Sequence, residues 1–350
     1  MSLSNLSSKI CSRLRRKIYL SVQDGCWSRS FCLRPLSGSW ALAVFVKNWL
    51  YDRHILPIRR VSAPVISIGN LVAGGSGKTP LVHLLAQSLS DLGPIAIISR
   101  GYLAKKSGLA LGDELTMLSR RLPLARCFAN PDRTIAAKEA INCGARLLIL
   151  DDAFQHRRLH RDFDFVVIDA ANPFGYRAFL PCGLLRDPPS RLKDAHAIFI
   201  NGRADDRLRE DLRRWSQSPQ VEVSLCLEKV LNLKGEEQNK LAGCKVGAFC
   251  AIGQPRRFFD TLSQTHAEIV DRCVFPDHEK FEISHIQEFA DRCRRLGATA
   301  IICSEKDAIK IQFDCTILPI YYLEMQLKVV YGKENWRQLI EKIHSTSKGS

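Results

Sequence analysis

Short apolar runs alternate with stretches of helical periodicity along most of the chain. In the first half, runs rich in Val, Ile, Leu and Phe lie at residues 65–68, 94–99, 147–150, 165–169 and 197–201. Such runs are typical of parallel strands that are buried on both faces. Between the first two runs, apolar residues recur at helical spacing from Leu81 to Leu92, before Gly93 and Pro94. The pattern predicts an α/β fold with a mostly parallel sheet flanked by helices.

The second half repeats this alternation on a smaller scale. Strands are expected at 221–227, 246–252, 298–303 and 318–323, and helices at 256–265, 284–296 and 333–344. A charged, polar stretch at 203–220 separates the two halves, and 350 residues is long for a single core. We therefore expect a basic N-terminal segment (1–60), a larger α/β domain (61–220) and a smaller C-terminal α/β domain (221–350).

The stretch PVISIGNLVAGGSGKTP at residues 64–80 predicts a strand, a glycine-rich turn and the start of a helix. Glycines allow the backbone N–H groups of such a turn to point at phosphate oxygens, here from residues 72–77, which are Val72, Ala73, Gly74, Gly75, Ser76 and Gly77. Lys78 would neutralise phosphate charge, and the Thr79 hydroxyl would bind Mg²⁺. Val72 occupies the position of the first glycine of the full P-loop pattern, so a glycine turn with an incidental lysine stays open on this motif alone.

A second half of a nucleotide site follows in the run LLILDD at residues 147–152. Asp151 and Asp152 end an aliphatic strand, as the Mg²⁺-binding acid of a P-loop protein does. Together with the glycine-rich turn some 70 residues earlier, they predict a site for a nucleoside triphosphate and Mg²⁺.

Three other features have two interpretations from the residues alone. Asp113 and Glu114 precede a predicted helix at 115–121, where acidic residues often act as an N-terminal cap. The loop at 173–193, rich in Pro and Gly, is either a surface excursion or part of the site. His278 lies in a polar connection, where a histidine is usually only solvated.

The formal charge of +15 is concentrated before the predicted core. Residues 1–60 hold eleven Lys and Arg but only two Asp, and the segment WALAVFV at 40–46 is followed by Lys47, Trp49 and Tyr51. The apolar part is too short to span a bilayer, which needs about 20 residues. It fits a helix lying on an anionic membrane surface, or alternatively a helix packed on the nucleotide-binding domain.

The thirteen cysteines include no C-x-x-C pair and mostly lie in apolar runs, as Cys250 and Cys303 do. We interpret them as buried thiols, and no zinc site is expected.

Taken together, the motifs resemble those of the tetraacyldisaccharide 4'-kinase family, the lipid A 4'-kinases of Gram-negative envelope synthesis. The resemblance runs from about Leu36 to the C-terminal end and rests on IGNLVAGGSGKTP, ISRGY, GDE, DDAFQHRRL, FGYRAFLPCGLLRDPPSRL, IGQPRRFF, FPDHEKF and SEKDAIK. It implies a P-loop fold that uses ATP and Mg²⁺ to phosphorylate the 4'-hydroxyl of a lipid disaccharide. The implied location is the cytoplasmic face of the inner membrane, with anionic lipid as a second partner.

The resemblance also implies roles for individual residues. Asp113 matches the catalytic carboxylate and His278 its partner, while Lys78 is expected to act in both binding and catalysis. Asp151 and Asp152 match the Mg²⁺ pair, with Glu114 and Thr79 as further metal-site residues. Site residues that bind the nucleotide include Arg133, Gln155 and Arg186. Three positions depart from the family pattern: Asp187 replaces Glu after Arg186, which puts a metal role there in doubt, and Ala153 and Phe154 replace Gly and Leu.

Two other functions share some of these features. A P-loop GTPase of the metallochaperone type should carry an N-K-x-D motif, but the chain has Asn201-Gly202-Arg203 at a strand end, and Glu305-Lys306-Asp307 has the wrong spacing. A nucleic-acid-binding ATPase should distribute its basic residues around a groove, whereas here they precede the core. No nucleic-acid partner is therefore expected. A monomer is expected, although the sequence leaves the oligomeric state open.

Overall fold

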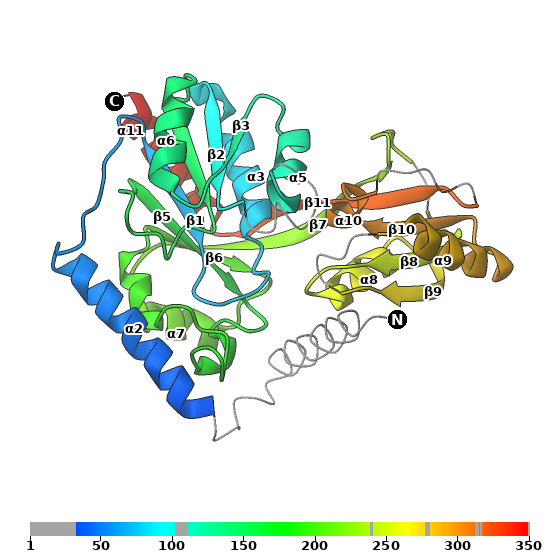
Figure 1. Cartoon of the computed structure of the whole chain (residues 1–350), viewed down its shortest axis with the longest axis horizontal. Coiled ribbons are helices and arrows are strands. Elements are labelled where there is room, and N and C mark those ends of the chain that lie inside the picture. Colours follow the sequence, from blue (N-terminus) through cyan, green and yellow to red (C-terminus); the bar gives the residue numbers. More distant parts are fainter. Residues whose placement is uncertain are drawn as a thin grey trace, which may run out of the picture.

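The computed structural model of the chain describes residues 33–101, 111–238, 241–276, 281–311, 315 and 317–348. Within these residues one 11-stranded sheet runs through the molecule, with its strands in the order β3-β2-β4-β1-β5-β6-β7-β11-β10-β8-β9 (Figure 1). Every neighbouring pair is parallel except β7 with β11. The predicted α/β fold with a mostly parallel sheet is confirmed.

The five apolar runs of the first half form strands that are buried along their whole length. They are β1 (Val65–Gly69), β2 (Ile95–Ser99), β4 (Leu147–Asp151), β5 (Phe163–Asp169) and β6 (Ala197–Asn201). Side chains of β1 alternate between two cores: Ile66 packs with α3 on one face, and Val65 packs with α6 on the other. Continuous apolar runs are explained by this arrangement, because both faces of the sheet are covered by helices.

The helices of this half are α3 (Lys78–Ser88), α5 (Asp113–Arg121), α6 (Arg133–Asn142) and α7 (Asp206–Trp215), with short 3-10 turns at Ser90–Leu92, Gly175–Arg177 and Pro189–Asp194. The edge strand β3 (Arg126–Ala129) and helix α6 were not predicted. Both lack a strong apolar pattern, since β3 is only partly covered and α6 buries mainly alanines.

In the second half the predicted elements are all present, with shifted ends. They are β8 (Lys245–Cys250), α8 (Pro255–Ser263), α9 (Ile283–Arg295), β10 (Ala300–Ser304) and α11 (Lys333–Lys348), joined by β9 (Glu268–Val274) and the short α10 (Glu305–Ala308). Of the ten described cysteines, four are buried, including Cys250 and Cys303. Five are only partly buried and Cys143 is exposed, so the interpretation of the cysteines as buried thiols is wrong for these six.

Strands β7 (Gln220–Asn232) and β11 (Ile320–Tyr331) form a long antiparallel ribbon that joins the two halves (Figure 1). After β11 the chain returns to the first half, where Leu339 and Ile343 of α11 pack in the same core as Ile66. The first core thus contains residues from both sides of position 220. The division into domains at that position stays a prediction.

Helix α2 (Arg34–Asp52) lies as a long rod beside the first half (Figure 1). Only Val44 and Asn48 of it are buried, while apolar side chains including Leu36, Leu42 and Phe45 are about 60% exposed. Among the described residues, none of the helices has the length and apolarity that crossing a membrane requires.

Candidate nucleotide-binding site

The glycine-rich turn joins β1 to α3 at the centre of the sheet. Gly77 is the N-cap of α3 with φ of 94°, in the left-handed region that glycine favours. A Cβ atom at Gly77 would lie 2.6 Å from Nδ2 of Asn201, so a larger residue does not fit. By contrast, Cβ atoms added at Gly74 or Gly75 would meet no atom within 4 Å, so the turn is uncrowded at these two positions.

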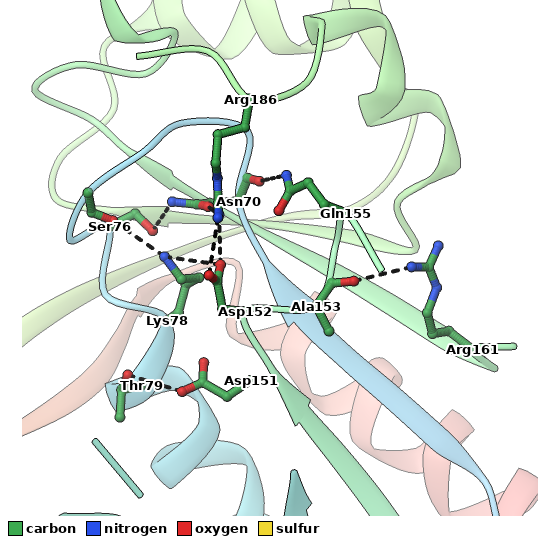
Figure 2. A network of polar contacts seen from close by, with 11 residues as sticks. Asn70, Ser76, Lys78, Thr79, Asp151, Asp152, Ala153, Gln155, Arg161 and Arg186 are labelled. Carbon is green, nitrogen blue, oxygen red and sulfur yellow. Dashed lines mark hydrogen bonds and ion pairs between the residues drawn. The ribbon is translucent and has the colours of Figure 1, made fainter. Parts of the chain in front are cut away.

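Two buried asparagines fix the position of Ser76 in this turn. Asn70 Nδ2 donates to the Ser76 hydroxyl at 2.9 Å (Figure 2). Asn201 Nδ2 donates to the Ser76 carbonyl at 3.0 Å. Sequence reasoning did not identify either asparagine as a site residue. The available signal was their position, since each ends or follows a parallel strand at the edge where ligands bind in α/β sheets.

Asp152 is the centre of a charged network beside the turn. Lys78 Nζ lies 3.5 Å from its carboxylate, and the Arg186 guanidinium binds it through two nitrogens at 2.7 and 3.1 Å (Figure 2). Arg186 also donates to the side-chain oxygen of Asn70. Burial opposes ionisation of Asp152, but the charges of Lys78 and Arg186 outweigh it and hold the pKa of this carboxyl well below its usual range.

Asp151 has a different environment from its neighbour. Its side chain is buried at the end of β4, and the Thr79 hydroxyl donates to Oδ2 at 3.3 Å (Figure 2). Oδ1 is buried and has no hydrogen-bond partner among the described residues. Burial raises the pKa of Asp151 to about 7, and the charges of Glu114 and Asp152 add to the rise. A carboxylate oxygen in this situation suits a bound cation, which would satisfy it and favour its ionised form.

Two other predicted site residues, Arg133 and Gln155, lie in the region of Asp151 and Asp152. Arg133 is the first residue of α6 and is buried, which lowers its pKa, whereas the charges of Asp152 and Asp151 act in the opposite direction. Gln155 donates from its side chain to the Asn70 carbonyl at 2.8 Å (Figure 2). The structure therefore gathers the two aspartates, Arg133 and Gln155 around the end of β1.

Asp113 and Glu114 begin α5, whose first turn faces the site, since the charge of Glu114 acts on Asp151. Asp113 is buried, and its Oδ2 atom lies 3.6 Å from Lys310 Nζ. His278 lies outside the described residues, so its pairing with Asp113 stays a prediction. Among the described residues no three His, Cys, Asp or Glu side chains form a metal cluster. This does not conflict with Mg²⁺, which is usually bound through one or two carboxylates together with phosphates and water.

Asp187 faces away from this network, toward helix α2. Its side chain is 1% exposed and accepts a hydrogen bond from Asn48 Nδ2 at 2.9 Å. Nearby contacts also join α2 to the region of the site, with Lys47 Nζ 3.0 Å from the Gln155 carbonyl and Arg157 Nη1 3.0 Å from the Asn48 carbonyl. The observed contact of Asp187 is thus structural and fixes α2 against the loop that carries Arg186.

A glycine-rich turn, a lysine and threonine at the start of α3, and paired aspartates at the end of a neighbouring strand define a P-loop nucleotide-binding protein. Comparison with known proteins identifies which one. The sequence model of the family "Tetraacyldisaccharide-1-P 4'-kinase" matches residues 29–345. The chain belongs to the tetraacyldisaccharide 4'-kinase family.

Individual relatives agree with this assignment over most of their length. The tetraacyldisaccharide 4'-kinase of Chlamydia abortus is 34% identical over 89% of this chain and 90% of the relative. That of Syntrophus aciditrophicus is also 34% identical, over 85% and 88%. A crystal structure of LpxK from Aquifex aeolicus in complex with ATP superposes with a TM-score of 0.72 at 28% identity, covering 89% of this chain and 98% of that one.

Proposed function

We propose that this chain transfers the γ-phosphate of ATP to the 4'-hydroxyl of a tetraacyldisaccharide 1-phosphate. The observation that carries the proposal is the arrangement of Lys78, Thr79, Asp151 and Asp152 around an open glycine turn. The names of the relatives supply the acceptor, and the ATP complex of the Aquifex aeolicus protein supports the donor.

The residues present fit a triphosphate with Mg²⁺. The backbone N–H groups of residues 72–77 would hold the phosphates, and Gly74 and Gly75 are uncrowded in this turn. Asp151 and Thr79 would hold the cation, and Glu114, whose charge acts on Asp151, would bind it directly or through water. When bound, the cation neutralises charge on the phosphate oxygens.

Lys78 and Arg186 complete the charge compensation. Both cations bind Asp152, so this carboxylate holds them in place beside the turn. Phosphoryl transfer depends mainly on positioning and on neutralising oxygen charge, and these two side chains, with Arg133, supply three positive charges for it.

The acceptor hydroxyl must lose its proton during the transfer. We assign this step to Asp113, which begins α5 directly before Glu114, with His278 as its proposed partner. If the two act as a unit, replacing both with alanine should lower kcat little more than replacing one. Losses that multiply would assign them independent roles.

We also propose that helix α2 docks on an anionic membrane surface, at the cytoplasmic face of the inner membrane, to reach the acylated substrate. Its exposed Trp40, Leu42 and Phe45 have no covering element among the described residues, and aromatic side chains favour the membrane interface. We expect Phe45→Ser to reduce binding to anionic phospholipid vesicles. Leu124→Ser is the matched control, since Leu124 is 87% exposed on a different part of the surface.

The activity is tested with γ-labelled ATP and a tetraacyl disaccharide acceptor in detergent micelles. Label should appear in the lipid with ATP and Mg²⁺, and Lys78→Ala should abolish it. Hydrolysis of GTP at a rate that does not depend on the lipid acceptor would contradict the proposal and favour a nucleotide-driven switch.

A further inference from the structure

Lys310 lies next to the proposed catalytic carboxylate, although it comes from the far end of the chain. It follows the short helix α10, and its side chain is only 3% exposed. Its Nζ atom lies 3.6 Å from Asp113 Oδ2 and 3.1 Å from Asp307 Oδ1. The ammonium group therefore bridges two buried carboxylates from parts of the chain that are 194 residues apart, since 307 minus 113 is 194.

Asp307 is itself fixed in place by the second half of the sheet. It is fully buried, and its Oδ2 atom accepts hydrogen bonds from the Ser304 hydroxyl at 2.5 Å and from the Ala251 backbone N–H at 2.9 Å. Its other oxygen is the one that holds Lys310. The position of the ammonium group is thus set, through Asp307, by residues at the ends of strands β8 and β10.

Charge balance makes this cation necessary at its position. A buried carboxylate is costly unless it is paired, and removing one member of a buried ionic group leaves the others uncompensated. Removing Lys310 would take one ionic contact away from both Asp113 and Asp307.

The same contact joins the two halves of the sheet at the site. Asp113 begins α5 in the first half, whereas Lys310 is held by the second half. At the other end of α5, Arg121 lies 3.5 Å from Glu305 of α10. Helix α5 is therefore fixed at both ends by ionic contacts with the segment around α10, so its first residue has one defined position.

We propose that Lys310 is a positioning residue for phosphoryl transfer, which holds Asp113 in place for the acceptor hydroxyl through its contact with Asp307. The inference rests on the proposed role of Asp113 in the kinase reaction. It adds a residue to the site that makes no direct contact with the substrates.

The test uses Lys310→Met, which keeps the volume and removes the charge, and Lys310→Arg, which keeps the charge. In the full chain we expect Lys310→Met to lower kcat on the order of 100-fold with little change in KM for ATP, as misplacement of a reacting group does. Lys310→Arg should restore a large part of the activity. Lys328→Met on the exposed face of β11 is the control and should match the wild type.

A double-mutant cycle separates positioning from a general effect on structure. Because Lys310 would act through Asp113, adding Lys310→Met to Asp113→Asn should lower the residual kcat little further. The melting temperature and the Kd for ATP are measured on every variant. If Lys310→Met does not fold, Lys310→Gln, which keeps a hydrogen-bond donor, should give the same loss of kcat and the same cycle.

Two results would overturn the inference. One is a folded Lys310→Met or Lys310→Gln protein with near wild-type kcat, and the other is a loss of the same size in the wild-type and Asp113→Asn backgrounds. If Asp113→Asn itself keeps full activity, the assigned role of Asp113 fails and the inference fails with it. That outcome can be distinguished from a failure of the Lys310 inference alone, because it is measured on Asp113→Asn without any Lys310 variant.

Discussion

Glu305 should make the stability of this protein depend on pH, and replacing it with glutamine should remove that dependence. Its carboxylate lies 3.5 Å from Arg121, whose guanidinium also contacts Glu228 at 3.1 Å and Glu324 at 3.3 Å. One cation thus serves three carboxylates. Burial raises the pKa of Glu305 to about 7, with Arg121 opposing the rise and the charges of Glu324 and Glu228 adding to it.

The size of this effect on the free energy of unfolding follows from the raised pKa of Glu305 and its ordinary value of 4.5. A rise to about 7 corresponds to about 3 kcal/mol of linkage. Between these two values the folded protein keeps a proton on Glu305 that the unfolded chain has lost. The contribution of Glu305 to the free energy of unfolding is therefore greatest below pH 4.5 and falls until about pH 7. Above that value both states are ionised and the loss is complete.

The assay is denaturant-induced unfolding of the wild type and Glu305→Gln, followed by tryptophan fluorescence. The difference in free energy of unfolding, wild type minus variant, should fall by about 2 kcal/mol or more between about pH 5 and about pH 8. Other titrating groups, such as Asp151, cancel in this difference. Glu334→Gln on the exposed surface of α11 is the control and should show no such change. A difference that stays constant with pH would refute the reasoning.

Three further predictions concern the site and its supports. Lys78→Ala should lower kcat at least on the order of 100-fold in a kinase assay, since an uncompensated phosphate charge costs about 3 kcal/mol, while its circular dichroism spectrum stays that of the wild type. Gly69→Ala should lower the melting temperature strongly, because its Cβ would lie 2.5 Å from Phe154 Cβ, whereas Gly75→Ala has open space and should not. Asn48→Ala should reduce the free energy of unfolding by about 1–3 kcal/mol in denaturant titrations, because a buried carboxylate loses its donor; an unchanged value would argue against the α2 contact.

The parts of the fold that sequence predicts well are those with strong local patterns. The buried strands β1, β4 and β6 are short and mostly apolar, and their length favours strands over helices, which are usually longer. Strand β3 was missed because its four residues Arg126–Ala129 lie at the sheet edge and mix polar with apolar positions. The ends of β7 and β11 were placed too early because the ribbon is partly exposed and loses its apolar pattern.

The same division applies to the candidate site. Short local sequence motifs identified Lys78, Thr79 and the paired aspartates as site residues. Asn201 was not, since its contact with Ser76 joins residues 125 positions apart. Lys310 is another example, because nothing in its local sequence shows that two carboxylates meet there. Such contacts are set by tertiary packing, which a single sequence does not display.

The return of the chain through α11 has a consequence for biosynthesis. Ile66 begins the first core, but Leu339 and Ile343 complete it. A growing chain on the ribosome therefore exposes this apolar surface until some 280 further residues have been made, because 343 minus 66 is 277. Partly synthesised chains should need chaperone protection throughout that interval, and the nucleotide-binding half should not become protease-resistant during translation before α11 has emerged.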